Sequence, residues 1–234
     1  MPHLAMMQSN VFTPRSISGL QAWWNPDSGI TKNAVTNRIS SWVDVVGGHT
    51  VSQATGAQQP LYVAASANMN SRPSIQFDVQ PQMLTITSAP ANLNVQQGQF
   101  TYLAVARGAN DVMGNSVAIG SFLLMLFSSK VRAHVWYTVL KTQDGLTTVS
   151  STTKAMVGQM ADATTLYPIL NGAKDNVGVA IGTPTTPTTT INIGSRGSGA
   201  SFLGFMGDVF IFNKALSNAE LTQMYNWAKA KWAL

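Results

Sequence analysis

The chain has 234 residues, 45% of them hydrophobic, which is enough to build one domain with a substantial core. It contains no cysteine, and this excludes disulfide staples, thiolate chemistry and cysteine-ligated metals. Only 10% of the residues are charged, against about 25% in an average globular protein. Because a free cytosolic monomer usually relies on more charge for its solubility, we expect much of the surface to lie inside an assembly, such as a virion or another polymer.

The sequence indicates neither a nucleic-acid surface nor a membrane segment. Its net charge of +5 reflects scarce acids, and lysine and arginine are scattered along the chain without basic clusters. Residues 1–19 lack the basic and apolar regions of a secretory signal. The longest apolar candidate, residues 118–127, is much shorter than the ~18 residues of a membrane span. We therefore expect a soluble protein without a signal peptide.

The first 16 residues show no strand or helix period. Residues 1–16 are therefore interpreted as an N-terminal arm that is either disordered or docked on a neighbouring subunit. The remainder, residues 17–234, is predicted to form a single domain that includes a helix at residues 217–232.

Short apolar runs separated by glycine- and proline-rich turns predict about a dozen β-strands. The predicted strands are residues 19–24, 38–46, 73–78, 82–87, 100–107, 117–127, 131–140, 147–151, 156–160, 166–170, 189–193 and 204–212. Asn171-Gly172 is a strong hairpin-turn signal. Residues 183–190, TPTTPTTT, are predicted to form an extended exposed loop. Many short strands with one helix indicate an antiparallel sandwich or barrel.

The end of the chain carries the clearest local signals. In residues 204–212 the odd-numbered and even-numbered side chains point to opposite faces of a strand, and both sets are largely apolar, so we expect this strand to be covered on both sides. Ser217 and Glu220 have the spacing of a helix capping box, with Leu216 placed to pack on Leu221. The apolar stripe that follows predicts an amphipathic helix. Its members are Leu221, Met224, Tyr225, Ala228 and Trp232.

Seven short motifs follow one another along nearly the whole chain. They are Gly19-Leu20-x-Ala22-Trp23-Trp24, Asp27-x-Gly29, Trp42-x-Asp44, Arg72-Pro73-Ser74-Ile75-x-Phe77-Asp78, Tyr167-x-x-Leu170-Asn171-Gly172, Ile193-Gly194-Ser195, and residues 204–212 followed by Ala215-Leu216-Ser217-x-x-Glu220. In their order and spacing these motifs resemble laminin G-like domains of the concanavalin A-like lectin/glucanase superfamily. The resemblance implies an all-β fold, an antiparallel two-sheet jelly-roll sandwich of the concanavalin A type with one C-terminal amphipathic helix.

The same resemblance implies glycan or protein binding and, in some branches, glycoside hydrolysis, although a fold fixes no function by itself. Stand-alone domains of this kind resemble those found in tailed-bacteriophage virions, on capsids, tails or fibres. We therefore predict a non-enzymatic structural component of a virus particle, a capsid decoration or tail/fibre protein located in the virion. Its expected partners are other virion proteins, further copies of itself and bacterial surface glycans. The alternatives are a carbohydrate-binding adhesin module without a capsid-stabilising role, and a glycoside hydrolase.

The distribution of acids argues against hydrolysis. Glycosidases need two carboxylates that flank the bond, about 5–5.5 Å or 6.5–9.5 Å apart. The glucanase branches supply them from alternate positions of one strand. This chain has a single glutamate, Glu220, which the helix cap uses, and its aspartates are isolated from one another. An aspartate pair brought together by folding stays open at this point.

Metal sites have little support in the sequence. The three histidines, His3, His49 and His134, are far apart and form no zinc motif, so no cofactor is expected. Calcium is the alternative, because some members of the family bind it through Asp and Asn side chains on rim loops. Asp111 with Asn115, or Asn171 with Asp175, have the residue types for this role. The competing interpretation is that each of them shapes a turn.

Aromatic side chains are the candidates for sugar contact, because sugar rings stack on indole and phenol rings. Trp23, Trp24 and Trp42 lie in the opening motifs and are interpreted as core, and Trp227 and Trp232 as packing of the helix. The remaining pair, Trp136 and Tyr137, is adjacent in a predicted strand and so faces opposite ways. Together with Asn171 and Arg196 on rim loops, they are the candidate carbohydrate-binding residues. The alternative is that all four are structural.

Overall fold

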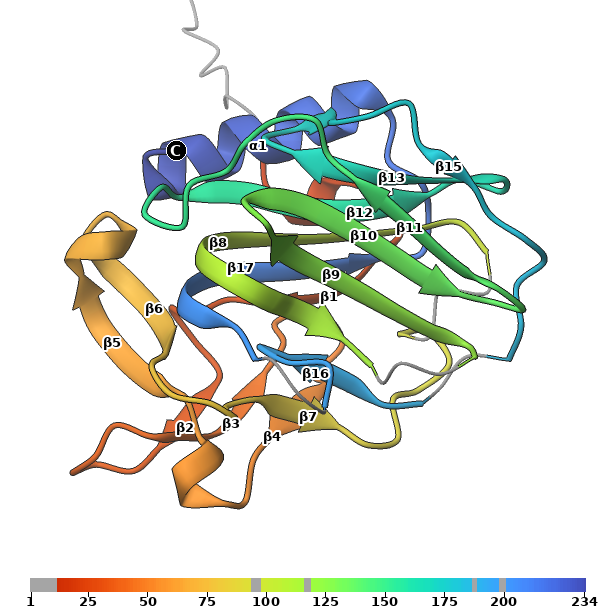
Figure 1. The fold of residues 1–234 in the computed structure, drawn as a ribbon. Helices are drawn as coiled ribbons and strands as arrows, with labels where there is room; N and C mark the ends of the chain where they lie inside the picture. The colour runs from red at the N-terminus through yellow and green to blue at the C-terminus, as the bar shows by residue number, and fades with distance from the viewer. Residues whose placement is uncertain (1–11, 94–97, 116–118, 187–188, 198–200) are drawn as a thin grey trace, which may run out of the picture.

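The structure, a computed structural model, describes residues 12–93, 98–115, 119–186, 189–197 and 201–234. Two antiparallel β-sheets pack face to face, and one helix lies along the outer face of one of them (Figure 1). This confirms the predicted all-β jelly-roll sandwich with a C-terminal helix. Of the predicted arm, residues 1–11 lie outside the described residues, and the boundary after residue 16 stays a prediction. Phe12 packs against the apolar layer beneath the helix.

Sheet A forms the layer next to the helix. Its strands are β5 (Leu61–Ser66), β6 (Arg72–Phe77), β1 (Leu20–Trp24), β17 (Leu203–Phe212), β8 (Phe100–Gly114), β12 (Ala155–Ala161), β13 (Thr165–Leu170), β14 (Ala173–Lys174) and β15 (Val179–Ala180). The strand β17 is central, because it pairs with β8 along one edge and with both β6 and β1 along the other.

Sheet B forms the other layer. Its strands are β2 (Ile30–Lys32), β3 (Ile39–Val43), β4 (Thr50–Ser52), β7 (Leu84–Ile86), β16 (Ile191–Ile193), the end of β8, β9 (Ser121–Phe127), β10 (Lys130–Trp136) and β11 (Leu140–Asp144). The long strand β8 belongs to both sheets, pairing with β12 in its first half and with β9 in its second. Gly108 lies at this crossing, where a Cβ atom would come within 2.2 Å of the Leu203 carbonyl oxygen. Three short 3-10 helices lie in the connections that the structure describes. They are η1 (Pro14–Ser16), η2 (Gly56–Gln58) and η3 (Ala67–Met69).

Two apolar layers hold the fold together. The first fills the space between the sheets and includes Trp24, Trp42 and Tyr102, all fully buried. The second lies between sheet A and helix α1 (Asn218–Trp232) and includes Phe210 and Trp232. Both faces of β17 are therefore covered, as predicted. Burial of each large apolar side chain contributes about 1.5–3 kcal/mol, so the helix is an integral part of the core.

The predicted division of β17 into two faces is wrong at one point. A bulge between Met206 and Val209 shifts the register, so Met206 faces the inter-sheet core together with Val209. Phe205, on the preceding position, packs instead beneath the helix. Gly207 lies within this bulge, and the ring of Trp232, from helix α1, occupies the space where a Cβ atom of Gly207 would be.

Helix α1 follows its prediction closely. Ser217 Oγ accepts the backbone N–H of Glu220 at 3.2 Å, and a Glu220 carboxylate oxygen accepts the N–H of Ser217 at 2.8 Å, which completes the capping box. Leu221, Met224, Ala228 and Trp232 are buried against sheet A and Tyr225 is half-buried.

Most predicted strands exist, with two errors. The predicted strand at residues 131–140 is a hairpin of β10 and β11. The predicted strand at residues 147–151 is a loop, in which the backbone and hydroxyl of Thr147 bond to Asp175. The Asn171-Gly172 turn is confirmed, with positive φ angles of 47° and 82°.

Candidate functional site

Strand β10 alternates between two environments. Its odd-numbered residues, Val131, Ala133 and Val135, are buried between the sheets. Its even-numbered residues are half-buried on the opposite face of sheet B. The sequence KVRAHVW has this period of two, so the strand itself presents basic and aromatic side chains outward.

The neighbouring strands complete this surface through their register. Phe127, Met125 and Leu123 of β9 stand opposite Lys130, Arg132 and His134. On the other side, Leu140, Thr142 and Asp144 of β11 stand opposite Trp136, His134 and Arg132. We call this surface the outer face of sheet B. Its members are Leu123, Met125, Phe127, Arg132, His134, Trp136, Leu140, Thr142 and Asp144.

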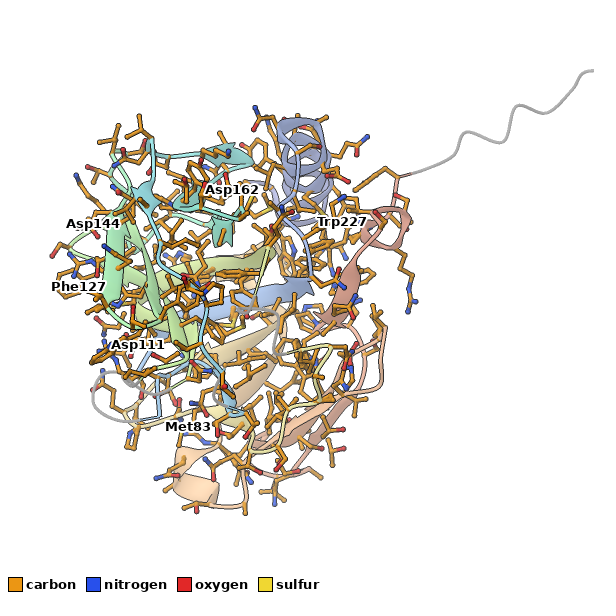
Figure 2. The ribbon with its side chains drawn as sticks, turned by 90° about the vertical axis from the view of Figure 1, so that its right-hand side faces the viewer. Met83, Asp111, Phe127, Asp144, Asp162 and Trp227 are labelled. Atoms are coloured by element: carbon orange, nitrogen blue, oxygen red, sulfur yellow. The ribbon has the colours of Figure 1, made fainter. Side chains whose placement is uncertain are left out.

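The accessible part of this face is aromatic and apolar. Phe127 is 40% exposed and Leu140 is 43% exposed, while Trp136 is half-buried. The guanidinium carbon of Arg132 lies 4.0 Å from the centroid of the Phe127 ring. Phe127, Asp111 and Asp144 lie on one side of the molecule and Trp227 of helix α1 on the other (Figure 2). The face is therefore separated from the helix by the thickness of the sandwich.

Two ion pairs fix the polar groups here. Arg132 donates from Nε and Nη2 to the two carboxylate oxygens of Asp144 at 2.5 and 2.7 Å. This pairing raises the pKa of Arg132 and lowers that of Asp144. Arg196 donates in the same two-pronged way to Asp111, at 2.5 and 2.8 Å, and its Nη2 lies 4.0 Å from the sulfur of Met125. Bidentate pairs of this kind hold both side chains in place.

His134 lies between these cations. Burial, and then the charges of Arg132 and Arg196, lower its pKa to about 4. Its imidazole is therefore neutral at pH 7. The buried Nε2 atom makes no hydrogen bond within the described part of the chain.

The structure brings two of the predicted binding residues to one surface. Trp136 is on the outer face of sheet B, and Arg196 borders it through Met125 and Asp111. The other two residues lie elsewhere. Tyr137 is 1% exposed in the inter-sheet core, where burial raises its pKa to about 12. Asn171 lies in the turn after β13, where its side-chain oxygen accepts the N–H of Met156.

Sequence reasoning did not single out Phe127, Arg132 and His134 as members of the site. The signal was present, because the alternation in residues 130–136 places Arg132 and His134 on the Trp136 face. Phe127 could not be assigned to this surface from the sequence alone, because its place depends on the register between β9 and β10, in which it pairs with Lys130.

The residues proposed for calcium use their oxygens within the fold. Both carboxylate oxygens of Asp111 bind Arg196, and the Asn115 side-chain oxygen accepts the N–H of Phe122. Asp175 accepts the hydroxyl of Thr147 at 2.6 Å. Asp111 lies inside β8, so the idea that it shapes a turn is wrong. Within the described ranges no group of three or more His, Cys, Asp or Glu side chains is placed to hold a metal ion.

Folding does bring two distant carboxylates together. Asp27 and Asp208 each bind the ammonium group of Lys231, at 2.9 and 3.0 Å. Asp208 is 0% exposed and also accepts the indole N–H groups of Trp23 and Trp232, at 2.8 and 2.7 Å. Burial raises the pKa of Asp208, against the opposing effect of Lys231. Asp208 therefore ties helix α1 to β17 and has no surface for a substrate.

No protein-family profile and no curated protein sequence matches the chain. Solved structures share its fold. Domain 4 of AbnA, a GH43 extracellular arabinanase from Geobacillus stearothermophilus in complex with arabinotriose, has a TM-score of 0.63 at 12% identity, covering 88% of this chain and 98% of that one. The Ruminococcus gnavus IT-sialidase CBM40 bound to α2,3 sialyllactose has a TM-score of 0.54 at 16% identity, covering 65% of this chain and 96% of that one.

The Trypanosoma rangeli sialidase in complex with sialic acid has a TM-score of 0.59 at 14% identity, and the match covers 89% of this chain but 33% of the sialidase. At these identities the likeness concerns the fold, a β-sandwich of lectin-like type. Among the described residues no helix has the length and apolar character needed to cross a bilayer.

Proposed function

We propose that this protein is a non-enzymatic module that contacts glycans through the outer face of sheet B. The observation that carries the proposal is that three side chains lie together on this face. The ring of Phe127 is exposed, the guanidinium of Arg132 lies over that ring, and the indole of Trp136 is half-buried. Ligand surfaces of this type combine aromatic contact area with a few placed polar groups. Two proteins of similar fold are bound to sugars, one to arabinotriose and one to sialyllactose, which supports the proposal.

The polar groups of this face can form hydrogen bonds with the hydroxyl groups of a sugar. Arg132 and Asp144 are partly exposed even though they bind one another. A sugar hydroxyl both donates and accepts hydrogen bonds, so it can bridge such a donor and acceptor. The neutral His134 adds no charge to this face. An uncharged or weakly acidic glycan is the ligand that this set favours.

A non-catalytic role is supported by what the carboxylates do. The chain has nine acidic residues, and the side chain of each accepts a hydrogen bond or forms an ion pair within the fold. Asp27 and Asp208 meet at Lys231, but the carboxylate of Asp208 is fully buried and so is not accessible to a substrate. Incubation with arabinan, xylan and β-glucan, followed by a reducing-end assay, tests this. New reducing ends that disappear in Asp27→Asn would establish hydrolysis and overturn the non-enzymatic role.

The finer proposal is that the module is a structural component of a virus particle, a capsid decoration or tail/fibre protein, that binds other virion proteins or further copies of itself. It is supported by the charge content of 10% and by the resemblance of the sequence motifs. Leu146 and Val177, 68% and 88% exposed, are apolar side chains of the kind that partners cover. The alternative is an adhesin module without a capsid-stabilising role.

Two experiments separate these possibilities. A glycan array that includes bacterial surface polysaccharides tests sugar contact, and a negative result across the array would refute it. Sedimentation of the full chain and of a chain lacking residues 1–14 tests assembly. We expect the full chain to self-associate and the shortened chain to fold but remain monomeric. A full chain that stays monomeric at high concentration would favour the adhesin alternative.

A further inference from the structure

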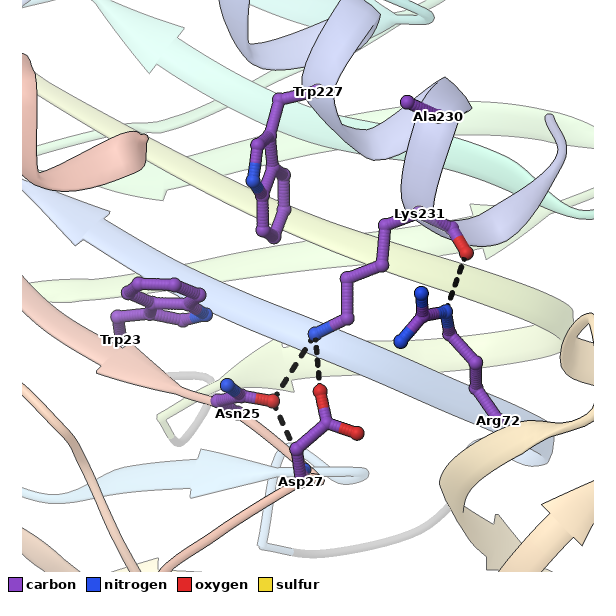
Figure 3. Close-up of a pocket in the computed structure, with 7 residues that line it drawn as sticks. All are labelled: Trp23, Asn25, Asp27, Arg72, Trp227, Ala230 and Lys231. Carbon is purple, nitrogen blue, oxygen red and sulfur yellow. Dashed lines mark hydrogen bonds and ion pairs between the residues drawn. The ribbon is translucent and has the colours of Figure 1, made fainter. Parts of the chain in front are cut away.

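A pocket of about 420 Å³ opens at the end of helix α1, on the side of the molecule away from the outer face of sheet B. Its walls come from four segments: β1, the turn that follows it, the start of β6 and the last turns of α1. It is lined by Trp23, Asn25, Asp27, Arg72, Trp227, Ala230 and Lys231 (Figure 3). Its volume lies in the range of about 300–1,000 Å³ that is usual for small-ligand sites.

The aromatic wall of this pocket is rigid. The rings of Trp23 and Trp227 meet edge to face with centroids 5.5 Å apart, and both stack on or against Phe210. The indole N–H of Trp23 is held by Asp208. Both indoles are half-buried, so each retains surface toward the pocket. An aromatic wall that is already ordered costs little entropy when a ligand packs on it.

Polar groups with unused hydrogen-bonding capacity stand opposite this wall. Arg72 donates from Nε to the carbonyl oxygen of Lys231 at 2.8 Å, and its two terminal nitrogens lie on the pocket side (Figure 3). Asn25 uses its side-chain oxygen for Lys231 and for the N–H of Asp27. Within the described residues, the terminal nitrogens of Arg72, the amide nitrogen of Asn25 and Oδ1 of Asp27 have no partner.

The charges of the pocket balance. Lys231 and Arg72 contribute two positive charges, and Asp27 and Asp208 two negative ones. Lys231 is also held above the rings of Trp227 and Trp232, at 5.4 and 5.0 Å from their centroids. A charged ligand would disturb this balance. A neutral ligand that both donates and accepts hydrogen bonds and has one apolar face fits it.

We propose that this Lys231 pocket is a second ligand site, which binds one residue of a neutral saccharide. The sugar ring lies against the indole of Trp227, its hydroxyl oxygens accept from Arg72 and Asn25, and one hydroxyl donates to Asp27. The site is separate from the outer face of sheet B, so either surface binds sugar without the other. A chain with both sites can bridge two glycan strands or two points on one strand.

Nuclear magnetic resonance of the six indole N–H groups in the full chain tests the site directly. Arabinotriose, xylotriose and maltotriose are titrated separately to about 10 mM, ten times the dissociation constant of a millimolar site. At least one of them is expected to shift the Trp227 signal in a saturable way. D-glucuronic acid serves as the charged probe and is expected to leave that signal unchanged.

Matched variants test whether the shift of the Trp227 signal comes from binding in the Lys231 pocket. Arg72→Ala is expected to weaken binding at least about tenfold, the loss of a hydrogen bond to a charged donor. Arg107→Ala is the control, because Arg107 also donates from Nε to a backbone carbonyl and lies near an aromatic ring, outside the pocket. Trp136→Ala is expected to leave the Trp227 shift intact, so a failure of the outer face of sheet B is distinguishable from a failure of this pocket. The proposal is overturned if none of the three neutral sugars shifts Trp227, if only glucuronic acid does, or if Arg72→Ala behaves like Arg107→Ala.

Discussion

Replacing Lys231 with methionine tests whether Asp208 is a buried structural carboxylate. Lys231 is 10% exposed and its nitrogen lies 3.0 Å from Oδ2 of Asp208, which is 0% exposed. Removing one partner of a buried ion pair costs about 3–5 kcal/mol when the other charge stays ionised. Two indole N–H groups still donate to Asp208, and the carboxyl group can take up a proton. We therefore expect Lys231→Met to lower the free energy of unfolding by about 3 kcal/mol at pH 7.

The pH dependence of this loss follows from the pKa of Asp208. Burial already raises this pKa above 3.8, and Lys231 opposes the rise, so removing Lys231 raises it further. A carboxyl group whose pKa is higher in the folded chain binds its proton more tightly when folded. The stability of Lys231→Met therefore increases as the pH falls toward that pKa. We expect the deficit to be smaller at pH 5 than at pH 7, and a single carboxyl group limits this change to about 1.4 kcal/mol per pH unit.

Urea denaturation followed by tryptophan fluorescence, at pH 7 and pH 5, measures both effects. Lys174→Met is the control, because Lys174 also lies over an aromatic ring, 3.8 Å from the centroid of Tyr167, but has no acidic partner among the described residues. A loss in Lys231→Met no larger than in Lys174→Met, or one that is the same at both pH values, would refute this account of Asp208.

Three further changes test other parts of the fold by urea denaturation. His134→Gln should flatten the pH dependence of the free energy of unfolding between pH 6.5 and about 4. In the wild-type chain this free energy falls by about 1–2 kcal/mol over that range, because the unfolded chain takes up a proton on His134 while the folded chain keeps the imidazole neutral. An unchanged slope would contradict the lowered pKa of His134. Gly207→Ala should lower the free energy of unfolding by about 1–3 kcal/mol, since the new Cβ would lie 2.7 Å from the ring of Trp232. Gly56→Ala is the control and should leave stability unchanged, because no atom lies within 4 Å of its Cβ position. Equal effects of the two substitutions would rule out the close packing at Gly207. Ser217→Ala should cost about 1 kcal/mol by removing the cap of α1, and no change would show that the capping box does not stabilise the helix.

The sequence predicted the elements that local signals determine. The capping box, the apolar stripe of α1, the turn at Asn171-Gly172 and the double burial of β17 all depend on residues within a few positions of one another. It missed the bulge at Gly207, where the chain packs against the ring of Trp232, a residue far along the chain.

The candidate sites were harder to predict, because they are built from long-range contacts. Trp136 and Arg196 come to one surface only through the pairing of β8, β9 and β10. The meeting of Asp27, Asp208 and Lys231 joins the two ends of the chain. Residue spacing carries no information about such contacts, whereas the alternation within β10 was readable.

Calorimetric titration of the wild-type chain and of Trp136→Ala, with the glycan that binds most strongly on an array, tests the central claim most directly. Tyr225→Ala is the control, a half-buried aromatic residue with Lys229 above its ring, 5.9 Å from the centroid, on the helix side. If glycans bind the outer face of sheet B, Trp136→Ala should weaken binding at least about tenfold, as expected for loss of an aromatic contact, while Tyr225→Ala should not change it. Full affinity in Trp136→Ala would contradict the claim.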